Sequence, residues 1–319
     1  MGLAAGPARE GRSERNQSLS RSTGMENAIR RLGLLGCGVM GSGIAEVAAR
    51  RGCYVVVWEV SGQALEGGRT RIGGSLDRAV ARDKLTREEA DEAADRIRYT
   101  LELPEAVSKA ELVIEAVVED HAVKTELFTE LDRLCPGGSI LATNTSSIPI
   151  AELAAVVQRP ERVVGLHFFN PVPVMPLVEV IPAIGTSAAT LERTLEVAHF
   201  LGKEAVVARD RSGFLVNLLL VPYLLDAVRH LDRGAASIED LDRAMVLGCG
   251  HPMGPLALCD FVGLDTALRI AEVMYDEYRE ERYAPPPLLK RLAAMGRLGR
   301  KTGKGFYDYT GEDPVPLPI

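Results

Sequence analysis

The spacing of apolar residues changes near residue 208. Before that point, short apolar runs with little alternation are followed by stretches with apolar residues at helical spacing. Such runs predict strands buried on both faces, and their alternation with helices predicts a parallel, doubly wound α/β sheet. The first expected strand is the short run that starts at Leu32. The other expected strands are 53–58, 112–118, 139–143, 162–168, 177–181 and 204–207. The expected helices are 44–49, 61–82, 86–95, 124–134 and 191–201.

After residue 208 the pattern is helical throughout, with Gly and Pro turn signals between segments. The segments are 215–231, 238–247, 255–261, 267–280 and 287–295. We therefore expect two domains, a Rossmann-like α/β domain over 25–208 and a smaller all-α domain over 209–319. Residues 1–24 are rich in Arg and Ser and are predicted to be a disordered tail, although a targeting segment is an alternative.

A glycine-rich turn follows the first apolar run. Gly36, Gly38 and Gly41 form G-x-G-x-x-G, and a helical pattern begins immediately after them. In dinucleotide-binding folds one glycine makes the turn, one lets the backbone approach a diphosphate, and one allows close helix–strand packing. The helix N-terminus then presents free N–H groups to the phosphates. We expect this turn, including Val39 and Met40, to bind a dinucleotide.

An acidic residue ends the second predicted strand. Glu59 lies 23 residues after Gly36, near the spacing of about 20 at which an acid binds the ribose hydroxyls. A carboxylate at this position repels a 2′-phosphate, and residues 60–63 contain no Arg or Lys. NAD is therefore favoured over NADP.

Composition excludes several function classes. The chain has 37 basic and 44 acidic residues, a net charge of −7, which argues against a nucleic-acid-binding surface. The longest apolar run, 214–225, is too short and interrupted to span a bilayer. The five cysteines form no C-x-x-C pair, so we expect buried free thiols, no metal site and a cytoplasmic location.

Two chemistry-bearing residues lie on neighbouring predicted strands. His167 is near the end of one strand, and Glu179 lies inside the next with a valine on each side. Because an unpaired buried charge is costly, Glu179 needs a partner, and His167 is the obvious one. A carboxylate holds the ring of a histidine and raises its basicity. We interpret the two residues as a general acid/base pair.

Several motifs together resemble those of the (S)-3-hydroxyacyl-CoA dehydrogenase family, in particular its short-chain 3-hydroxybutyryl-CoA branch. The resemblance extends from residue 30 to about 309. Its motifs are G-x-G-x-M-G-x-G-I-A at 36–45, E-A-V-V-E at 115–119, N-T-S-S-I at 144–148, H-F-F-N-P-V at 167–172, P-L-V-E-V at 176–180, G-F-x-V-N at 213–217, H-P-M-G-P at 251–255 and G-R-K-T-G-K-G-F-Y-D at 299–308.

The resemblance implies a role for each matching residue. His167 would take the proton from the 3-hydroxyl group and Glu179 would orient it, while Ser146 and Asn217 would bind the substrate near the reacting oxygen. The residues near the nicotinamide half of NAD would be Glu119, Lys124, Asn144, Ser146, Asn170 and Lys301. The resemblance also implies an enzyme of fatty acid metabolism that forms a homodimer and acts on a small acyl-CoA substrate.

The sequence does not decide whether the acyl group of the substrate is attached to CoA or to another carrier. The helix 61–82 matches the family poorly where relatives contact CoA. Arg69, Arg71 and Arg78 could bind the CoA phosphates there, or could form a solvated helix face. Alternative substrates are an acyl-carrier-protein-bound hydroxyacyl unit and L-gulonate, and a non-catalytic NAD-binding protein is a further alternative. Leu218 stands where the family often has Arg, and Glu59 where it often has Asp.

Overall fold

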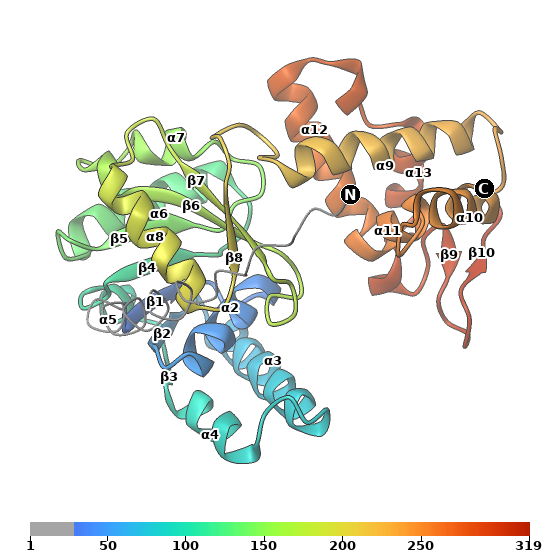
Figure 1. The fold of residues 1–319 in the computed structure, drawn as a ribbon. Helices are drawn as coiled ribbons and strands as arrows, with labels where there is room; N and C mark the ends of the chain where they lie inside the picture. Colours follow the sequence, from blue (N-terminus) through green and yellow to red (C-terminus); the bar gives the residue numbers. More distant parts are fainter. Residues whose placement is uncertain (1–28) are drawn as a thin grey trace, which may run out of the picture. The chain divides into compact units, whose positions relative to one another are not determined.

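The computed structural model describes residues 29–319, so the predicted tail over 1–24 lies outside the described residues. The chain divides into two compact units. Of the described residues, the first contains 29–144, Ala154–Val180 and Gly185–Val206, and the second contains Thr145–Leu153, Ile181–Ile184 and Val207–Ile319. Figure 1 shows the elements of each unit in chain order.

The first unit is built on an eight-stranded sheet with strand order β3-β2-β1-β4-β5-β6-β7-β8. The neighbouring pairs from β3 to β6 are parallel, and the order reverses between β1 and β4. This is the doubly wound topology expected from the sequence, and that prediction is confirmed. The strands are β1 (Arg31–Leu35), β2 (Tyr54–Trp58), β3 (Ile97–Thr100), β4 (Leu112–Glu115), β5 (Ile140–Thr143), β6 (Val163–Phe168), β7 (Leu177–Pro182) and β8 (Glu204–Val207).

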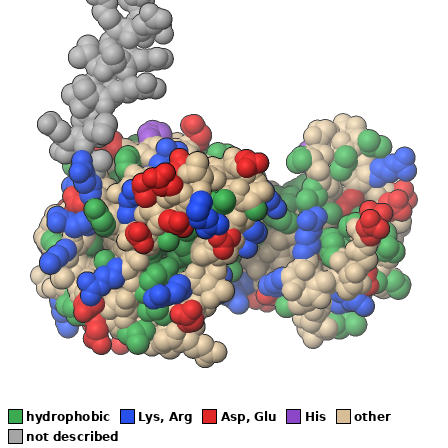
Figure 2. All heavy atoms as spheres, turned by 90° about the horizontal axis from the view of Figure 1, so that it is seen from below, with side chains coloured by type: hydrophobic (Ala, Val, Ile, Leu, Met, Phe, Trp, Pro, Cys, Tyr) green, Lys and Arg blue, Asp and Glu red, His purple; other side chains and the backbone are tan. Residues whose placement is uncertain are grey.

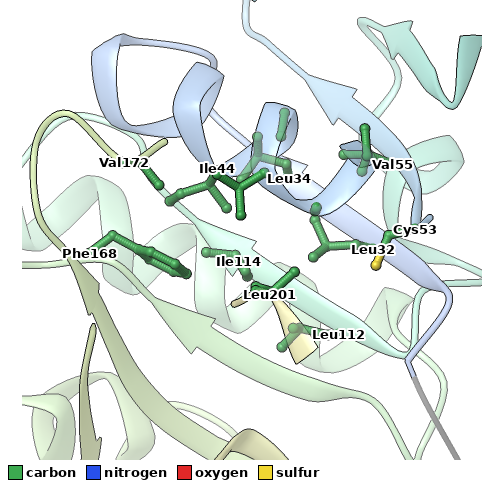
Figure 3. Close-up of a cluster of buried hydrophobic side chains, with 14 of the residues drawn as sticks. Leu32, Leu34, Ile44, Cys53, Val55, Leu112, Ile114, Phe168, Val172 and Leu201 are labelled. Carbon is green, nitrogen blue, oxygen red and sulfur yellow. The ribbon is translucent and has the colours of Figure 1, made fainter. Parts of the chain in front are cut away.

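Helices cover both faces of this sheet. Leu32 and Leu34 point to the face where α2 packs, and with Ile44 they belong to the main apolar core (Figure 3). Gly33 points to the other face, where a Cβ would lie 2.7 Å from the Ala106 carbonyl oxygen of α5. The helices are α2 (Val39–Arg50), α3 (Gly62–Ala81), α4 (Arg87–Asp95), α5 (Leu103–Val107), α6 (His121–Leu134) and α8 (Ala188–Phe200).

The second unit is mainly helical around a separate apolar core. Asp242 and Asp260 are buried and hold its C-terminal segment, because their carboxylates accept hydrogen bonds from the Tyr307 and Tyr309 hydroxyls respectively. The helices are α7 (Ile150–Ala154), α9 (Val216–Asp232), α10 (Ile238–Cys249), α11 (Pro255–Val262), α12 (Leu264–Tyr278) and α13 (Pro287–Ala294).

The apolar pattern missed several features, among them the short helices α5 and α7. Strand β3 was not predicted, because four residues after a helix give too short an alternation. The second unit is not purely helical, since β9 (Tyr307–Asp308) and β10 (Val315–Pro316) form a short antiparallel ladder. It also takes up Thr145–Leu153 and Ile181–Ile184, which the prediction assigned to the α/β domain.

The surface of the described residues mixes both signs of charge. On the face seen in Figure 2, basic and acidic side chains are interspersed. No helix within residues 29–319 is long and apolar enough to cross a membrane.

One cysteine differs from the expectation of buried thiols. Cys249 is exposed at the end of α10, beside Gly250, which adopts φ +69° at the helix C-cap. The other four, Cys37, Cys53, Cys135 and Cys259, are buried. Burial raises the pKa of Cys37 and of Cys53 to about 11 and that of Cys135 to about 12, and it also raises the pKa of Cys259.

We predict that one thiol of the folded protein reacts rapidly with a maleimide at pH 8. At that pH the buried thiols stay protonated, because pH 8 lies below their raised pKa values, and protonated thiols are poor nucleophiles. Mass spectrometry should place the label on Cys249, and Cys249→Ser should abolish the rapid phase. Rapid labelling that persists in Cys249→Ser would contradict the prediction.

Candidate active site

The glycine turn lies between β1 and α2. Gly36 has φ +89°, and a Cβ there would lie 2.6 Å from the Ala116 carbonyl oxygen. A Cβ on Gly41 would clash with the Gly36 carbonyl oxygen. A Cβ on Gly38 would meet no protein atom within 4 Å. Packing thus requires glycine at two of the positions, while the third leaves the start of α2 open to a ligand.

Glu59 is held against this turn from the end of β2. Its Oε1 accepts a hydrogen bond from the Cys37 N–H at 2.6 Å, and its Oε2 accepts one from the Val60 N–H at 3.2 Å. The turn and Glu59 border a cavity of about 540 Å³, termed here the first cavity. Of the residues predicted to bind the cofactor, those that line it are Gly36, Gly38, Val39, Met40 and Glu59.

Sequence reasoning missed the other walls of the first cavity. They are Trp58, Val60, Ala116–Val118 and one face of α6. The residues on that face, Val123, Glu126, Leu127 and Glu130, recur at helical spacing. The sequence shows this helical spacing, but the spacing by itself indicates only that one side of the helix faces other parts of the protein.

A buried ion pair lies beside the first cavity. Lys124 Nζ is 2.6 Å from Glu115 Oε1, and both side chains are almost wholly excluded from solvent. Glu115 Oε1 also accepts the Val117 N–H at 2.7 Å, and Oε2 accepts the Thr143 hydroxyl at 2.7 Å. Glu119 Oε2 lies 3.2 Å from the same ammonium group. Two of the predicted cofactor residues, Glu119 and Lys124, therefore share one network.

Polar contacts continue across the ends of the next strands. Asn144, which follows β5, accepts the Phe168 N–H on its Oδ1 at 2.8 Å. His167 of β6 and Glu179 of β7 are both buried, with His167 Nδ1 2.7 Å from Glu179 Oε2. The ring of Phe169 lies 4.6 Å from that of His167, centroid to centroid. With an ionised Glu179 as acceptor, Nδ1 carries the proton and Nε2 is the basic nitrogen.

The next predicted residues are Ser146, Asn217 and Lys301. Ser146 and Asn217 belong to the second unit, in the segment after β5 and in the first turn of α9. Lys301, also in the second unit, forms an ion pair with Asp265 at 2.5 Å. Their grouping with His167 around a substrate stays a prediction.

Two residues just after the predicted domain boundary were not predicted to have a role. The Asp210 carboxylate accepts the Ile150 and Ala151 N–H groups at 2.7 Å each, and the Ser212 hydroxyl donates to the Ser147 carbonyl oxygen at 3.2 Å. These contacts anchor the segment that carries Ser146. A charged residue in a short polar stretch has no local signature of such a role.

A second cavity of about 380 Å³ lies between α2, α3 and the segment after β6. Its polar lining includes Ser42, Ser75, Arg71 and Arg78, and it also includes Asn170, which was predicted to lie near NAD. Arg69 does not line it, because its guanidinium lies over the Tyr99 ring at 4.6 Å. Within residues 29–319, no three His, Cys, Asp or Glu side chains form a potential metal site.

Two consecutive parts of the chain match the two domain models of one protein family. Residues 31–211 match the 3-hydroxyacyl-CoA dehydrogenase NAD binding domain, and residues 213–309 match the 3-hydroxyacyl-CoA dehydrogenase C-terminal domain. A 3-hydroxybutyryl-CoA dehydrogenase of Mycobacterium tuberculosis is 53% identical over 287 residues, which cover 89% of this chain and all of that protein.

Solved structures give the same result. The crystal structure of FadB2 from M. tuberculosis matches with a TM-score of 0.87 and 53% identity, over 89% of this chain and all of that one. The (S)-3-hydroxybutyryl-CoA dehydrogenase PaaH1 of Ralstonia eutropha matches with a TM-score of 0.84 and 41% identity, over the same shares. The match to an NAD binding domain confirms the prediction of NAD as cofactor. The open space at Gly38 and the carboxylate of Glu59 fit its diphosphate and its adenosine ribose.

We predict that Lys124→Met lowers the free energy of unfolding by about 3–5 kcal/mol, because it leaves the buried Glu115 carboxylate without its counter-charge. Urea denaturation measures the change. The double variant Lys124→Met/Glu115→Gln should regain part of the loss. The matched control Lys109→Met removes an exposed lysine and should change stability by less than about 0.5 kcal/mol. Equal stability of the two single variants would rule out the role of the pair.

Proposed function

The chain belongs to the 3-hydroxyacyl-CoA dehydrogenase family, and on this premise we propose that it oxidises short-chain (S)-3-hydroxyacyl-CoA to 3-oxoacyl-CoA and catalyses the reverse reduction. The observation that carries the proposal is the contact between His167, near the end of β6, and Glu179, inside β7, two buried side chains whose Nδ1 and Oε2 atoms are 2.7 Å apart. The family membership makes the chain an oxidoreductase, as its motifs predicted.

The proposed chemistry separates a hydride from a proton. Bound NAD supplies the acceptor for the hydride that leaves C3 of the substrate. His167 Nε2 accepts the proton of the 3-hydroxyl group, and Glu179 stabilises the imidazolium that forms. In the reverse direction the same nitrogen returns the proton. Burial of the pair strengthens the contact between the carboxylate and the ring, because little water screens it.

Ser146 and Asn217 are the proposed substrate ligands. Ser146 and Asn217 would donate hydrogen bonds near the reacting oxygen and steady its partial negative charge. The contacts of Asp210 and Ser212 support this role for Ser146, since they restrain the segment on which it lies. We also propose that the protein acts as a homodimer.

The second cavity is the proposed place for the phosphate groups of CoA. Arg78 lines it and forms no ion pair among residues 29–319, so its guanidinium is available for an anion. The guanidinium of Arg71 is already engaged with the glycine turn. Of the three arginines considered on this helix, Arg78 is thus the best supported CoA ligand.

We predict that His167→Gln keeps its affinity for NADH and loses turnover by about 10²–10⁴-fold, because the general acid/base is gone while the first cavity is intact. NADH binding is measured by fluorescence and turnover by NADH consumption with acetoacetyl-CoA. Glu179→Gln should fall between this variant and the parent, since an amide still accepts a hydrogen bond but does not balance the imidazolium charge. Turnover of His167→Gln near that of the parent would refute the assignment.

The carrier is tested by comparing acetoacetyl-CoA, acetoacetyl-acyl-carrier protein and free acetoacetate as substrates for NADH oxidation. We expect the highest kcat/KM with the CoA thioester, because Arg78 gives it a phosphate contact that the free acid lacks. Arg78→Met should raise KM for acetoacetyl-CoA several-fold, about the effect of one exposed charged contact, with the free acid unaffected. A higher kcat/KM with the carrier protein or the free acid would overturn the proposed substrate.

A further inference from the structure

Arg71 is a charged residue that the proposed chemistry does not use. It lies in α3, yet its side chain reaches the glycine turn of the first cavity. Nη2 donates a hydrogen bond to the Cys37 carbonyl oxygen at 2.6 Å, and Nε lies 3.3 Å from the Ser42 hydroxyl oxygen. The Ser42 hydroxyl in turn donates to the Gly38 carbonyl oxygen. Two successive carbonyl groups of the turn are thus bound by one small polar network.

The opposite side of the turn is bound as well. The Cys37 N–H donates to Glu59 Oε1 at 2.6 Å. Cys37 therefore has its N–H held by a carboxylate from the end of β2 and its carbonyl held by a guanidinium from α3. Both are charge-assisted hydrogen bonds, which are about twice as strong as neutral ones.

These contacts set the direction of the groups that face the ligand. In a trans peptide the C=O and the following N–H point in opposite directions. Holding the Cys37 carbonyl toward Arg71 directs the Gly38 N–H away from Arg71. Holding the Gly38 carbonyl toward Ser42 likewise directs the Val39 N–H away from Ser42. These N–H groups begin α2, where a helix has no internal acceptor for them.

We propose that Arg71 is a positioning residue of the cofactor site, which orients the Gly38 and Val39 N–H groups toward the diphosphate of the dinucleotide. The proposal deepens the proposed function and rests on NAD binding at the glycine turn. It does not depend on the identity of the acyl substrate.

Packing already holds α3 in place without this side chain. A Cβ on Gly68 would clash with Cys37 Sγ and Cβ, so the backbone of α3 packs directly against the Cys37 side chain. Ile72 and Leu76 of the same helix are buried in the main core. Arg71 is therefore not needed to place α3, and its removal should affect the orientation of the turn more than the fold.

The test compares Arg71→Met with Arg69→Met. Both variants remove one positive charge from α3, two residues apart, but the Arg69 guanidinium pairs with Glu66 and stacks on the Tyr99 ring. Fluorescence titration with NADH alone gives the dissociation constant. We expect about a tenfold weaker affinity for Arg71→Met, the effect of losing one charge-assisted hydrogen bond, and less than a twofold change for Arg69→Met. In kinetic assays the loss should appear in KM for NADH.

Conservative variants separate positioning from simple stabilisation. Arg71→Lys keeps a donor near the Cys37 carbonyl and should recover part of the affinity, while Ser42→Ala should weaken binding without changing any charge. Parent-like NADH affinity in Arg71→Met, or an equal loss in Arg69→Met, would overturn the proposal. If Arg71→Met does not fold, the same titrations on Arg71→Lys and Ser42→Ala decide, and parent-like affinity in both would overturn it. Because no acyl compound is present, a wrong substrate assignment would leave these results unchanged.

Discussion

The burial of Glu115 is the constraint on which the cofactor edge of the sheet depends. A carboxylate out of water must be matched by a counter-charge and hydrogen-bond donors, or it destabilises the fold by several kcal/mol. Here the partners come from three different elements, namely Lys124 of α6, the Val117 N–H after β4 and the Thr143 hydroxyl of β5. Meeting that requirement fixes β4, the following turn, α6 and β5 relative to one another, and the turn and α6 form one wall of the first cavity.

The same principle organises the neighbouring strand ends. Asn144 links β5 to β6 through the Phe168 N–H, and His167 links β6 to β7 through Glu179. Apolar packing places the strands and helices, but it is indifferent to the rotation of a peptide or an imidazole ring. Directional polar contacts supply that orientation, and here they are buried, where few water molecules compete for them.

Sequence reasoning succeeded where burial could be inferred from immediate neighbours. Glu179 has a valine on each side within a strand, so its need for a partner was evident, and the glycine spacing with Glu59 indicated the nucleotide turn. It failed where burial arises from distant segments. Lys124 occupies an ordinary helical position, and only the fold shows that it is enclosed. Strand β3 is defined by its pairing with β2, and the anchoring role of Asp210 depends on the start of α7, 60 residues earlier in the chain.

The glycines of the turn meet two different requirements, packing within the protein and access for the ligand, which the sequence motif does not distinguish. Gly36 and Gly41 serve the protein itself, whereas the position of Gly38 has room for a side chain as far as the protein is concerned. A single methyl group at that position would obstruct the ligand at almost no expense to the fold. Screens that rank variants by thermal stability or expression level would therefore pass such a protein as normal. For the same reason, a lineage of this fold could lose its cofactor in one step and persist as a stable, inactive protein.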